Sequence, residues 1–247
     1  HINVWQITLH FLPYLFNWDR EKATDIYDKI FINFPDICRS EEWVLQVARS
    51  LRFVSNIDTA RKWLIGIKNG GWYRSSQAFG ELILLWNCFY SDDDWGEKKL
   101  ETCLGNRKEE DFSRGIAFSA SHLWSYSKYQ RICSEVLLRL ANTDDEITQN
   151  AIASVCQYGE PLPLNDSMKN IINVILQNNA LLLKAAENII EGIEPQTAIE
   201  PDLAYRICKK FLEVGYEQIN NMGSSLSLLA EPLVRIALTL HRMDDYR

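Results

Sequence analysis

The chain has 247 residues, of which 47% are hydrophobic and 24% charged, and its formal net charge is −7. Its strongest apolar run, residues 82–86, is far shorter than the roughly 18 residues of a membrane-spanning helix. The acidic balance disfavours nucleic acid as a partner, because phosphate contacts require a clear basic stripe. These features predict a cytoplasmic protein that neither spans a membrane nor binds nucleic acid.

Apolar residues recur at helical spacing along nearly the whole chain, and the alternation typical of strands is almost absent, which predicts an all-α fold. Helix starts are indicated by Ser40, by Asp58 or Thr59, and by Asn165 or Asp166, because these side chains accept hydrogen bonds from free backbone N–H groups. The predicted helices cover residues 19–32, 60–68, 75–90, 95–104, 110–126, 129–141, 146–158, 166–177, 181–192, 202–219 and 225–241, with another that opens at Ser40.

An apolar run recurs along the chain, displaced by 37 and then by 36 residues. In each copy a small residue follows, 15 positions after the first member of the run. The runs are 63–67, 100–104 and 136–140, and the small residues are Ala78, Gly115 and Ala151. Periods of this size mark stacked helix pairs, none of which buries its apolar face without its neighbours. The pattern predicts an α-solenoid of antiparallel helix pairs with a period of about 36 residues.

Residues 135–146, followed by the small-residue segment 151–153, resemble a HEAT repeat. Such repeats have a leucine-rich first helix, an Asp-bearing turn and a second helix with a small-residue face. The likeness extends from Trp63 to Gly192. It implies a HEAT-like solenoid, an architecture that serves unrelated functions.

A second resemblance rests on residues 40–44, 60–64, 77–82 and 121–124, which are similar to the helical C-terminal regions of large bacterial STAND-type NTPases. In that family, which includes anti-phage defence proteins, a nucleotide-binding oligomerisation domain precedes a helical-repeat sensor. The resemblance implies that the chain is the sensing part of a longer protein. The catalytic residues, and any surface for oligomerisation, would then lie upstream. The start at His1, in mid-helix, favours the same expectation.

The clearest break in the helical pattern is the loop 159–164, which holds one Gly and two Pro. Because Gly and Pro interrupt helices, we predict a hinge at this loop. It would divide a Trp-rich segment, 1–158, from a second helical segment, 165–247. A weaker copy of the repeat at 170–186 favours one continuous solenoid through the break.

The cysteines are predicted to be reduced and buried. Cys88, Cys103, Cys133, Cys156 and Cys208 stand among apolar residues at helical spacing, and no CxxC pair is present. Free buried cysteine behaves as a small hydrophobe. This pattern is typical of cytosolic proteins rather than of disulfide frameworks or metal sites.

No motif for catalysis or for binding a cofactor stands in the sequence, which lacks GxxxxGK[ST], GxGxxG and GxSxG. The four histidines are scattered, and His122 faces away from its neighbour Ser121 because adjacent residues on a helix diverge. Three acidic clusters, at residues 92–94, 109–111 and 144–146, lack the spacing of oxygen ligands that an EF-hand requires. We therefore expect no catalytic residue, no metal and no cofactor in this chain.

One candidate for binding a protein partner is the turn that holds Trp72, Tyr73 and Arg74 after two glycines. Trp, Tyr and Arg are the residues on which binding energy concentrates. Packing across a repeat junction is the alternative for this turn. Core packing is predicted for the four tryptophans at apolar helical positions, Trp43, Trp63, Trp86 and Trp124.

The second candidate is the acidic turn Asp92-Asp93-Asp94 with the following Trp95. One reading is helix capping and solvation, since carboxylates favour helix N-termini. The other adds the acidic clusters 109–111 and 144–146, which would form a ridge for a basic partner because the turns of a solenoid line up along one edge.

The leading hypothesis is a non-catalytic sensor or scaffold that binds a protein partner along a helical-repeat surface. The alternative from another class is a HEAT-like DNA glycosylase, with Trp72, Trp86, Trp95 and Asp94 around an extruded base. The acidic balance speaks against that enzyme. A passive assembly adaptor is the third hypothesis.

Overall fold

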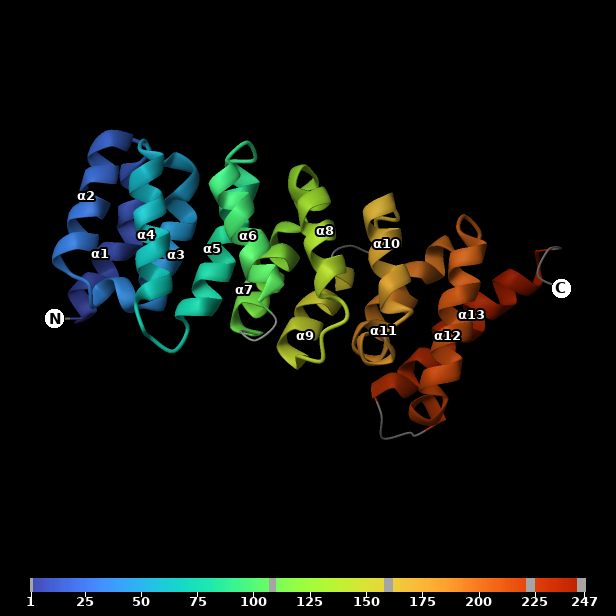
Figure 1. Ribbon diagram of the computed structural model, residues 1–247. Helices are drawn as coiled ribbons and strands as arrows, with labels where there is room; N and C mark the ends of the chain where they lie inside the picture. Colours follow the sequence, from blue (N-terminus) through green and yellow to red (C-terminus); the bar gives the residue numbers. More distant parts are fainter. Residues whose placement is uncertain (1, 107–109, 158–161, 221–224, 244–247) are drawn as a thin grey trace. The chain divides into compact units, whose positions relative to one another are not determined.

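The computed structural model describes residues 2–106, 110–157, 162–220 and 225–243 (Figure 1). Every regular element in these ranges is an α-helix or a short 3₁₀ helix, so the predicted all-α class is confirmed. The chain divides into two compact units, residues 1–119 and 120–247, with the boundary inside one helix. Each unit has a buried core of its own.

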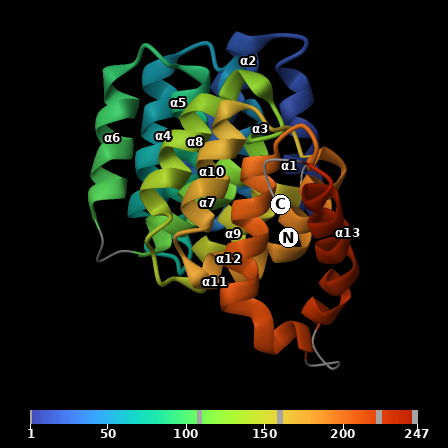
Figure 2. The ribbon, with the colours of Figure 1, turned by 90° about the vertical axis from the view of Figure 1, so that its right-hand side faces the viewer.

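The helices of the first unit lie in two rows. They are α1 (Ile2–Leu15), α2 (Arg20–Asn33), α3 (Glu41–Ser50), α4 (Ile57–Asn69), α5 (Ser75–Phe89), α6 (Asp94–Gly105) and most of α7 (Glu110–Leu123). In one row α3 packs between α1 and α5, and in the other α2 packs against α4. The rows are joined by the contacts of α5 with α4, and α5 also contacts α6. Figure 2 shows α4 beside α5, with α6 at the left. Each helix therefore buries one face against its neighbours.

Capping side chains fix several helix starts. Ser40 caps α3, as predicted, and Asn165 caps α10 of the second unit (Asp166–Ile175), also as predicted. The predicted start of α4 at Asp58 or Thr59 is wrong, because Asn56 Oδ1 accepts from both of their N–H groups, at 3.0 and 3.3 Å. Asn is as good an N-cap as Asp, and its position moves the start of this helix upstream.

Two helices are shorter than the sequence predicts. The helix expected at 110–126 ends at Leu123, and a 3₁₀ turn follows at Ser127–Tyr129. The helix expected at 146–158 ends at Ser154 and continues as a 3₁₀ turn to Gln157, while residue 158 lies outside the described residues. Helix ends commonly tighten in this way, which apolar spacing does not reveal.

The core of the first unit is built around aromatic rings. Tyr27 of α2, Trp43 of α3 and Trp63 of α4 are fully buried. The centroid of the Tyr27 ring lies 5.3 Å from that of Trp43 and 5.4 Å from that of Trp63. Trp86 and, in the second unit, Trp124 are buried as well, so the predicted core role of these four tryptophans is confirmed.

Two glycines let α5 and α7 approach each other closely. A Cβ atom at Gly80 would lie 2.4 Å from the Phe112 carbonyl oxygen, and one at Gly115 would lie 2.0 Å from the Gln77 carbonyl oxygen. Any larger residue would push the two backbones apart. The small residue that follows the second apolar run is thus required by a helix–helix contact.

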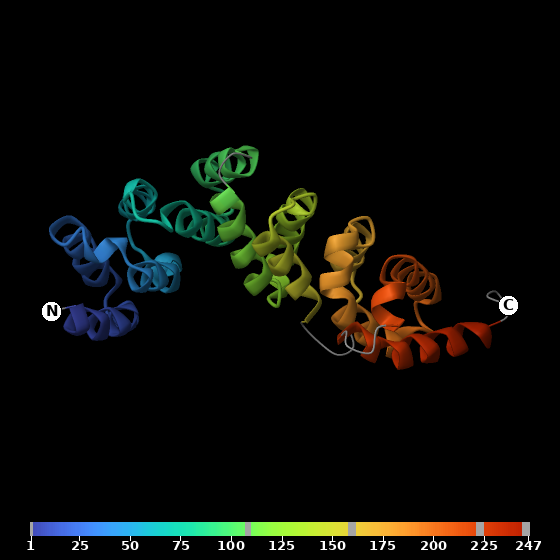
Figure 3. The same ribbon diagram turned by 90° about the horizontal axis from the view of Figure 1, so that it is seen from below.

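The second unit has an aliphatic core. Its helices are the end of α7, α8 (Gln130–Leu140), α9 (Glu146–Ser154), α10, α11 (Asn179–Ile193), α12 (Pro201–Asn220) and α13 (Ala230–His241). Of these, α10 packs against α8, and α11 contacts α9, α10, α12 and α13. Figure 3 shows α12, in orange, beside α13, in red. Ile189, Ile190 and Ile193 of α11 are fully buried at the centre of these contacts.

The predicted hinge loop 159–164 falls partly outside the described residues, which resume at Leu162. Leu162 is buried, its N–H donates to the Gly192 carbonyl at 3.3 Å, and its carbonyl accepts from Gln196 Nε2 at 2.8 Å. These bonds tie the end of the loop to α11 and the turn after it. The division of the chain at this loop stays a prediction.

All six cysteines are free and buried, as the sequence predicts. Burial raises the pKa of the Cys156 and Cys208 thiols to about 12. Both side chains are therefore neutral at physiological pH. Their role is to fill the core of the second unit.

Candidate functional site

The predicted partner-binding residues fall at opposite ends of α5. Residues 72–74 form the turn before its first residue, and residues 92–95 follow its last. The 15 residues of this helix separate the two segments by roughly 22 Å. They are therefore two separate places on the first unit and do not form a single site.

The turn 72–74 is fastened to the first turn of α3. Arg74 Nη1 donates to Glu41 Oε1 at 2.6 Å, and the Tyr73 hydroxyl donates to the same oxygen at 3.1 Å. These bonds, that of Arg74 first, lower the pKa of Glu41. Arg74 also pairs with Glu81 at 3.5 Å, and Trp72 is half-buried with its ring edge-on to Tyr73. Tyr73 is 82% exposed, so it offers the largest free surface of the three.

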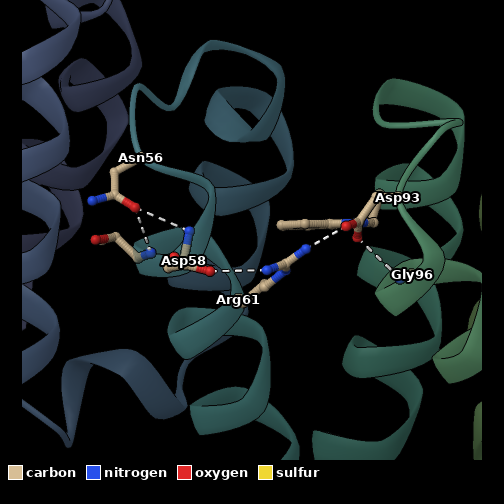
Figure 4. Close-up of polar contacts among 7 residues, drawn as sticks. Asn56, Asp58, Arg61, Asp93 and Gly96 are labelled. Carbon is tan, nitrogen blue, oxygen red and sulfur yellow. Dashed lines mark hydrogen bonds and ion pairs between the residues drawn. The ribbon is translucent and has the colours of Figure 1, made fainter.

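At the other end of α5, Asp93 holds a polar clamp that joins α4 to the start of α6 (Figure 4). Its carboxylate accepts from Trp86 Nε1 at 2.7 Å, from the Gly96 N–H at 3.1 Å and from the Arg61 guanidinium. Arg61 also donates to Asp58, at 2.8 Å. We refer to Arg61, Trp86, Asp93 and Gly96 as the Asp93 clamp.

The Asp93 clamp keeps its carboxylate ionised. Desolvation raises the pKa of Asp93, but the hydrogen bonds from Trp86, Gly96 and Arg61, with the charge of Arg61, outweigh it and lower the pKa below its ordinary value. A carboxylate with its charge and lone pairs engaged in this way is a poor proton acceptor. The chemistry of Asp93 is therefore structural: it caps α6 and anchors α4.

Aromatic rings pack around the clamp. The Trp95 and Trp86 rings meet edge to face with centroids 5.0 Å apart, and Arg61 Cζ lies 5.6 Å from the Trp95 centroid and 5.9 Å from that of Trp86. Gly96 leaves room for this arrangement, because a Cβ there would lie 2.3 Å from Trp86 Cδ1. Trp95 is half-buried and serves the same packing.

Asp92 and Asp94 remain exposed on either side of Asp93. Asp92 borders a shallow hollow of about 390 Å³. The hollow is lined by Ile57, Phe89, Tyr90, Ser91, Asp92 and Asp93. Its one enclosed carboxylate, that of Asp93, is already held by Arg61, so the hollow presents no free acid–base pair for catalysis.

Sequence reasoning missed a large exposed aromatic surface on α1 and the turn that follows it. Phe11, Tyr14 and Trp18 are 60%, 59% and 87% exposed, and the Phe11 and Tyr14 rings lie 6.4 Å apart. The spacing of Phe11 and Tyr14 places both on one face of α1, opposite the buried Leu9 and Leu12, and Trp18 lies in the turn that follows the helix. We call these three residues the aromatic face. The spacing of the aromatic residues in the sequence could have indicated this surface, but the same spacing is typical of a helix stripe that is buried in the core.

Arginine side chains lie near the end of the aromatic face, around the ring of Phe53, whose centroid is 6.5 Å from that of Phe16, a residue between Tyr14 and Trp18 in the chain. Arg20 Cζ lies 5.5 Å, and Arg52 Cζ 4.5 Å, from the centroid of the Phe53 ring. Arg49 is exposed one turn before Arg52. Among the arginines that the structure describes in the first unit, these three, the arginine group, form no ion pair with a described carboxylate.

Ionisable side chains do not gather into an evident reaction centre. Across the described ranges no three His, Cys, Asp or Glu side chains converge as metal ligands. His10, His122 and His241 are exposed on three different helices. Every helix within those ranges is too short or too polar to cross a bilayer.

Comparisons of the chain with protein-family models, with curated proteins and with solved structures find no match. The likenesses to HEAT repeats and to the sensor regions of STAND-type NTPases thus rest on the sequence segments that suggest them, and they stay predictions.

Proposed function

We propose that the chain is a non-catalytic protein-binding module, a HEAT-like helical-repeat solenoid that holds a protein partner on side chains exposed along its helices. The observation that carries the proposal is the aromatic face. Trp and Tyr are enriched among the interface residues that contribute most of the binding energy. Burying such side chains stabilises a complex by about 25 cal/mol for each Å² of apolar surface. Side chains as exposed as Trp18 contribute little to the fold that carries them.

The packing of the helices supports the solenoid part of the proposal. In the first unit α1, α3 and α5 follow one another in a row beside α2 and α4. In the second unit α9 packs on α11 and α8 on α10. Successive helix pairs that contact only their neighbours are the arrangement of repeat proteins, which expose long surfaces for partners.

The same proposal makes the chain the sensing part of a larger cytoplasmic defence NTPase. The resemblance to STAND-type sensor regions supports it. Binding of the partner would then bias an upstream domain through a difference in affinity for two states. The intact mass and N-terminal sequence of the native gene product test this step. A product several times longer, with GxxxxGK[ST] upstream, supports it, and a product of this length overturns it.

Protein binding itself is tested by affinity capture from a nuclease-treated extract of the source cells. The baits are the full chain and two variants, Phe11→Ser with Trp18→Ser, and Ile199→Ser. Ile199 is 74% exposed in the second unit and gives a matched control for loss of exposed apolar surface. Each substitution is at an exposed site, so unfolding free energies should change by less than about 0.5 kcal/mol.

We expect a discrete protein that the wild-type chain and the Ile199 variant retain and the double variant loses. The same proteins on all three baits would contradict the proposal. A third variant, Tyr73→Ser, asks whether the turn 72–74 belongs to the same surface. Loss of the partner in that variant would extend the binding surface from α1 to the start of α5.

No observation on the described residues favours the alternative of a HEAT-like DNA glycosylase. Trp72 lies at the other end of α5 from Asp94 and Trp95, and Trp86 is buried in the Asp93 clamp. These four residues do not surround one space. A passive adaptor would use the same aromatic face, and the mass of the native product separates it from the sensor.

A further inference from the structure

Two members of the arginine group are oriented by an aromatic ring. Arg20 and Arg52 both pack against the ring of Phe53. A guanidinium that lies over an aromatic ring keeps its N–H donors free at the edge of its plane. Because this packing already restricts both arginine side chains, they lose less conformational entropy on binding a carboxylate than a mobile arginine would.

Nearby carboxylates do not cancel this charge. Asp19, beside Arg20, caps α2 by accepting from the Lys22 N–H at 3.0 Å, and it pairs with the Lys22 ammonium at 3.3 Å. The hydrogen bond from the Lys22 N–H, with the charge of Lys22, lowers the pKa of Asp19. Glu21 follows Arg20, but successive residues of a helix do not face each other.

We propose that the aromatic face and the arginine group together bind an acidic segment of a protein partner. Aromatic or leucine side chains of the segment pack on Phe11, Tyr14 and Trp18, and its Asp or Glu side chains pair with the arginines. Rings one helical turn apart suit the anchor spacing of an amphipathic helix. This inference rests on the proposed protein-binding function and adds the chemistry of the partner.

The net charge of the whole chain favours a short acidic peptide over a nucleic acid as the ligand of the arginine group. The arginine group lies at the first residue of α2, in the last turn of α3 and in the 3₁₀ turn Leu51–Phe53, whereas the whole chain carries a net charge of −7. A phosphate polymer needs several basic contacts along its length, and the net negative charge of the whole chain opposes its approach. A short acidic segment needs only the local group, and arginine binds carboxylates with two parallel hydrogen bonds.

The test is a selection of displayed random peptides of about 16 residues, long enough for four helical turns, on the full wild-type chain. Counter-selection against the Trp18→Ala variant keeps only peptides that need the aromatic face. Selected peptides are then titrated against Arg52→Glu and against Lys62→Glu. Lys62 is exposed on α4 outside the arginine group, so its reversal matches the charge change without touching the face.

We expect the retained peptides to carry more Asp and Glu than Lys and Arg. Arg52→Glu should weaken their binding about tenfold or more, and Lys62→Glu less than about twofold. Retained peptides that are neutral or basic, or that bind both variants equally, would overturn the acidic-segment inference and leave the protein-binding function standing. A selection that retains nothing against Trp18→Ala would remove the aromatic face as a binding surface, and the proposed function with it. Tight, salt-sensitive binding of an oligothymidine without acidic peptides would assign the face to nucleic acid and also overturn the inference.

Discussion

The two ends of α5 carry similar residues, yet the polar side chains at one end are much more buried than those at the other. At the C-terminal end the side chains of Asp93 and Arg61 are 13% and 27% exposed and meet beside two tryptophans. At the N-terminal end Arg74 and Glu41 are 33% and 54% exposed, and Tyr73, which donates to Glu41, is 82% exposed. A cluster of Trp, Arg and carboxylate residues therefore indicates either a structural junction or an available surface, and burial decides which.

The largest effect is expected for Asp93→Ala. The substitution removes the N-cap of α6 and leaves Trp86 Nε1 and the Arg61 guanidinium without their acceptor. Loss of a cap costs about 1 kcal/mol, and leaving partly buried donors unpaired costs about 1–3 kcal/mol more. We expect the unfolding free energy, measured with urea, to fall by about 2–4 kcal/mol in total. Asp94→Ala, at the exposed neighbouring position, is the control, and an equal loss there would contradict the assignment.

Gly96→Ala tests the fit of the clamp and should have the next largest effect. The new Cβ would lie 2.3 Å from Cδ1 of the buried Trp86, so the ring or the helix must shift. Overpacking of this kind costs about 1–2 kcal/mol after the better helix propensity of Ala is allowed for. Gly105→Ala in the same helix is the matched control, since nothing lies within 4 Å of its added Cβ. Equal unfolding free energies of the two variants would contradict the prediction, because the Trp86 ring would then accommodate the added Cβ without cost.

Acid should weaken the Asp93 clamp selectively. Because the folded-state pKa of Asp93 is lowered, its contribution to stability is complete above its unfolded pKa of about 3.9 and is lost as the pH falls through the lower folded value. The wild-type chain should therefore lose more stability below about pH 4 than Asp93→Asn does. The loss is smaller than that of Asp93→Ala, since a protonated carboxyl still accepts from Gly96. Parallel pH profiles of urea unfolding for the two chains would contradict this assignment.

Much of the fold could be predicted from local pattern. Ser40 marks a helix start because its hydroxyl accepts from the backbone nearby, and Trp43 and Trp63 fall at apolar positions of single helices. The Asp93 clamp could not be predicted in the same way. Arg61 and Asp93 are 32 residues apart, and they meet only because α4, α5 and α6 pack side by side.

The aromatic face was missed for a related reason. The helix α1 carries two apolar stripes, one with Leu9 and Leu12 and the other with Phe11 and Tyr14. Periodicity marks both as candidates for the core. Contacts of α1 with α2 and α3 bury the first stripe and leave the second exposed. Such a choice depends on neighbouring helices, so it becomes visible only in the folded chain.

The smallest effect is expected at the other end of α5. Arg74→Ala should lower the unfolding free energy by about 0.5 kcal/mol, because an exposed ion pair is screened by solvent and salt. A double-mutant cycle of Arg74 with Glu41 should give a coupling energy below about 1 kcal/mol, and the matching cycle of Arg61 with Asp93 a larger one. A larger coupling for Arg74 and Glu41 would reverse the contrast between the two ends. If the coupling energies have the expected order, Tyr73 and Arg74 can be substituted to test a binding surface at little cost in folding stability.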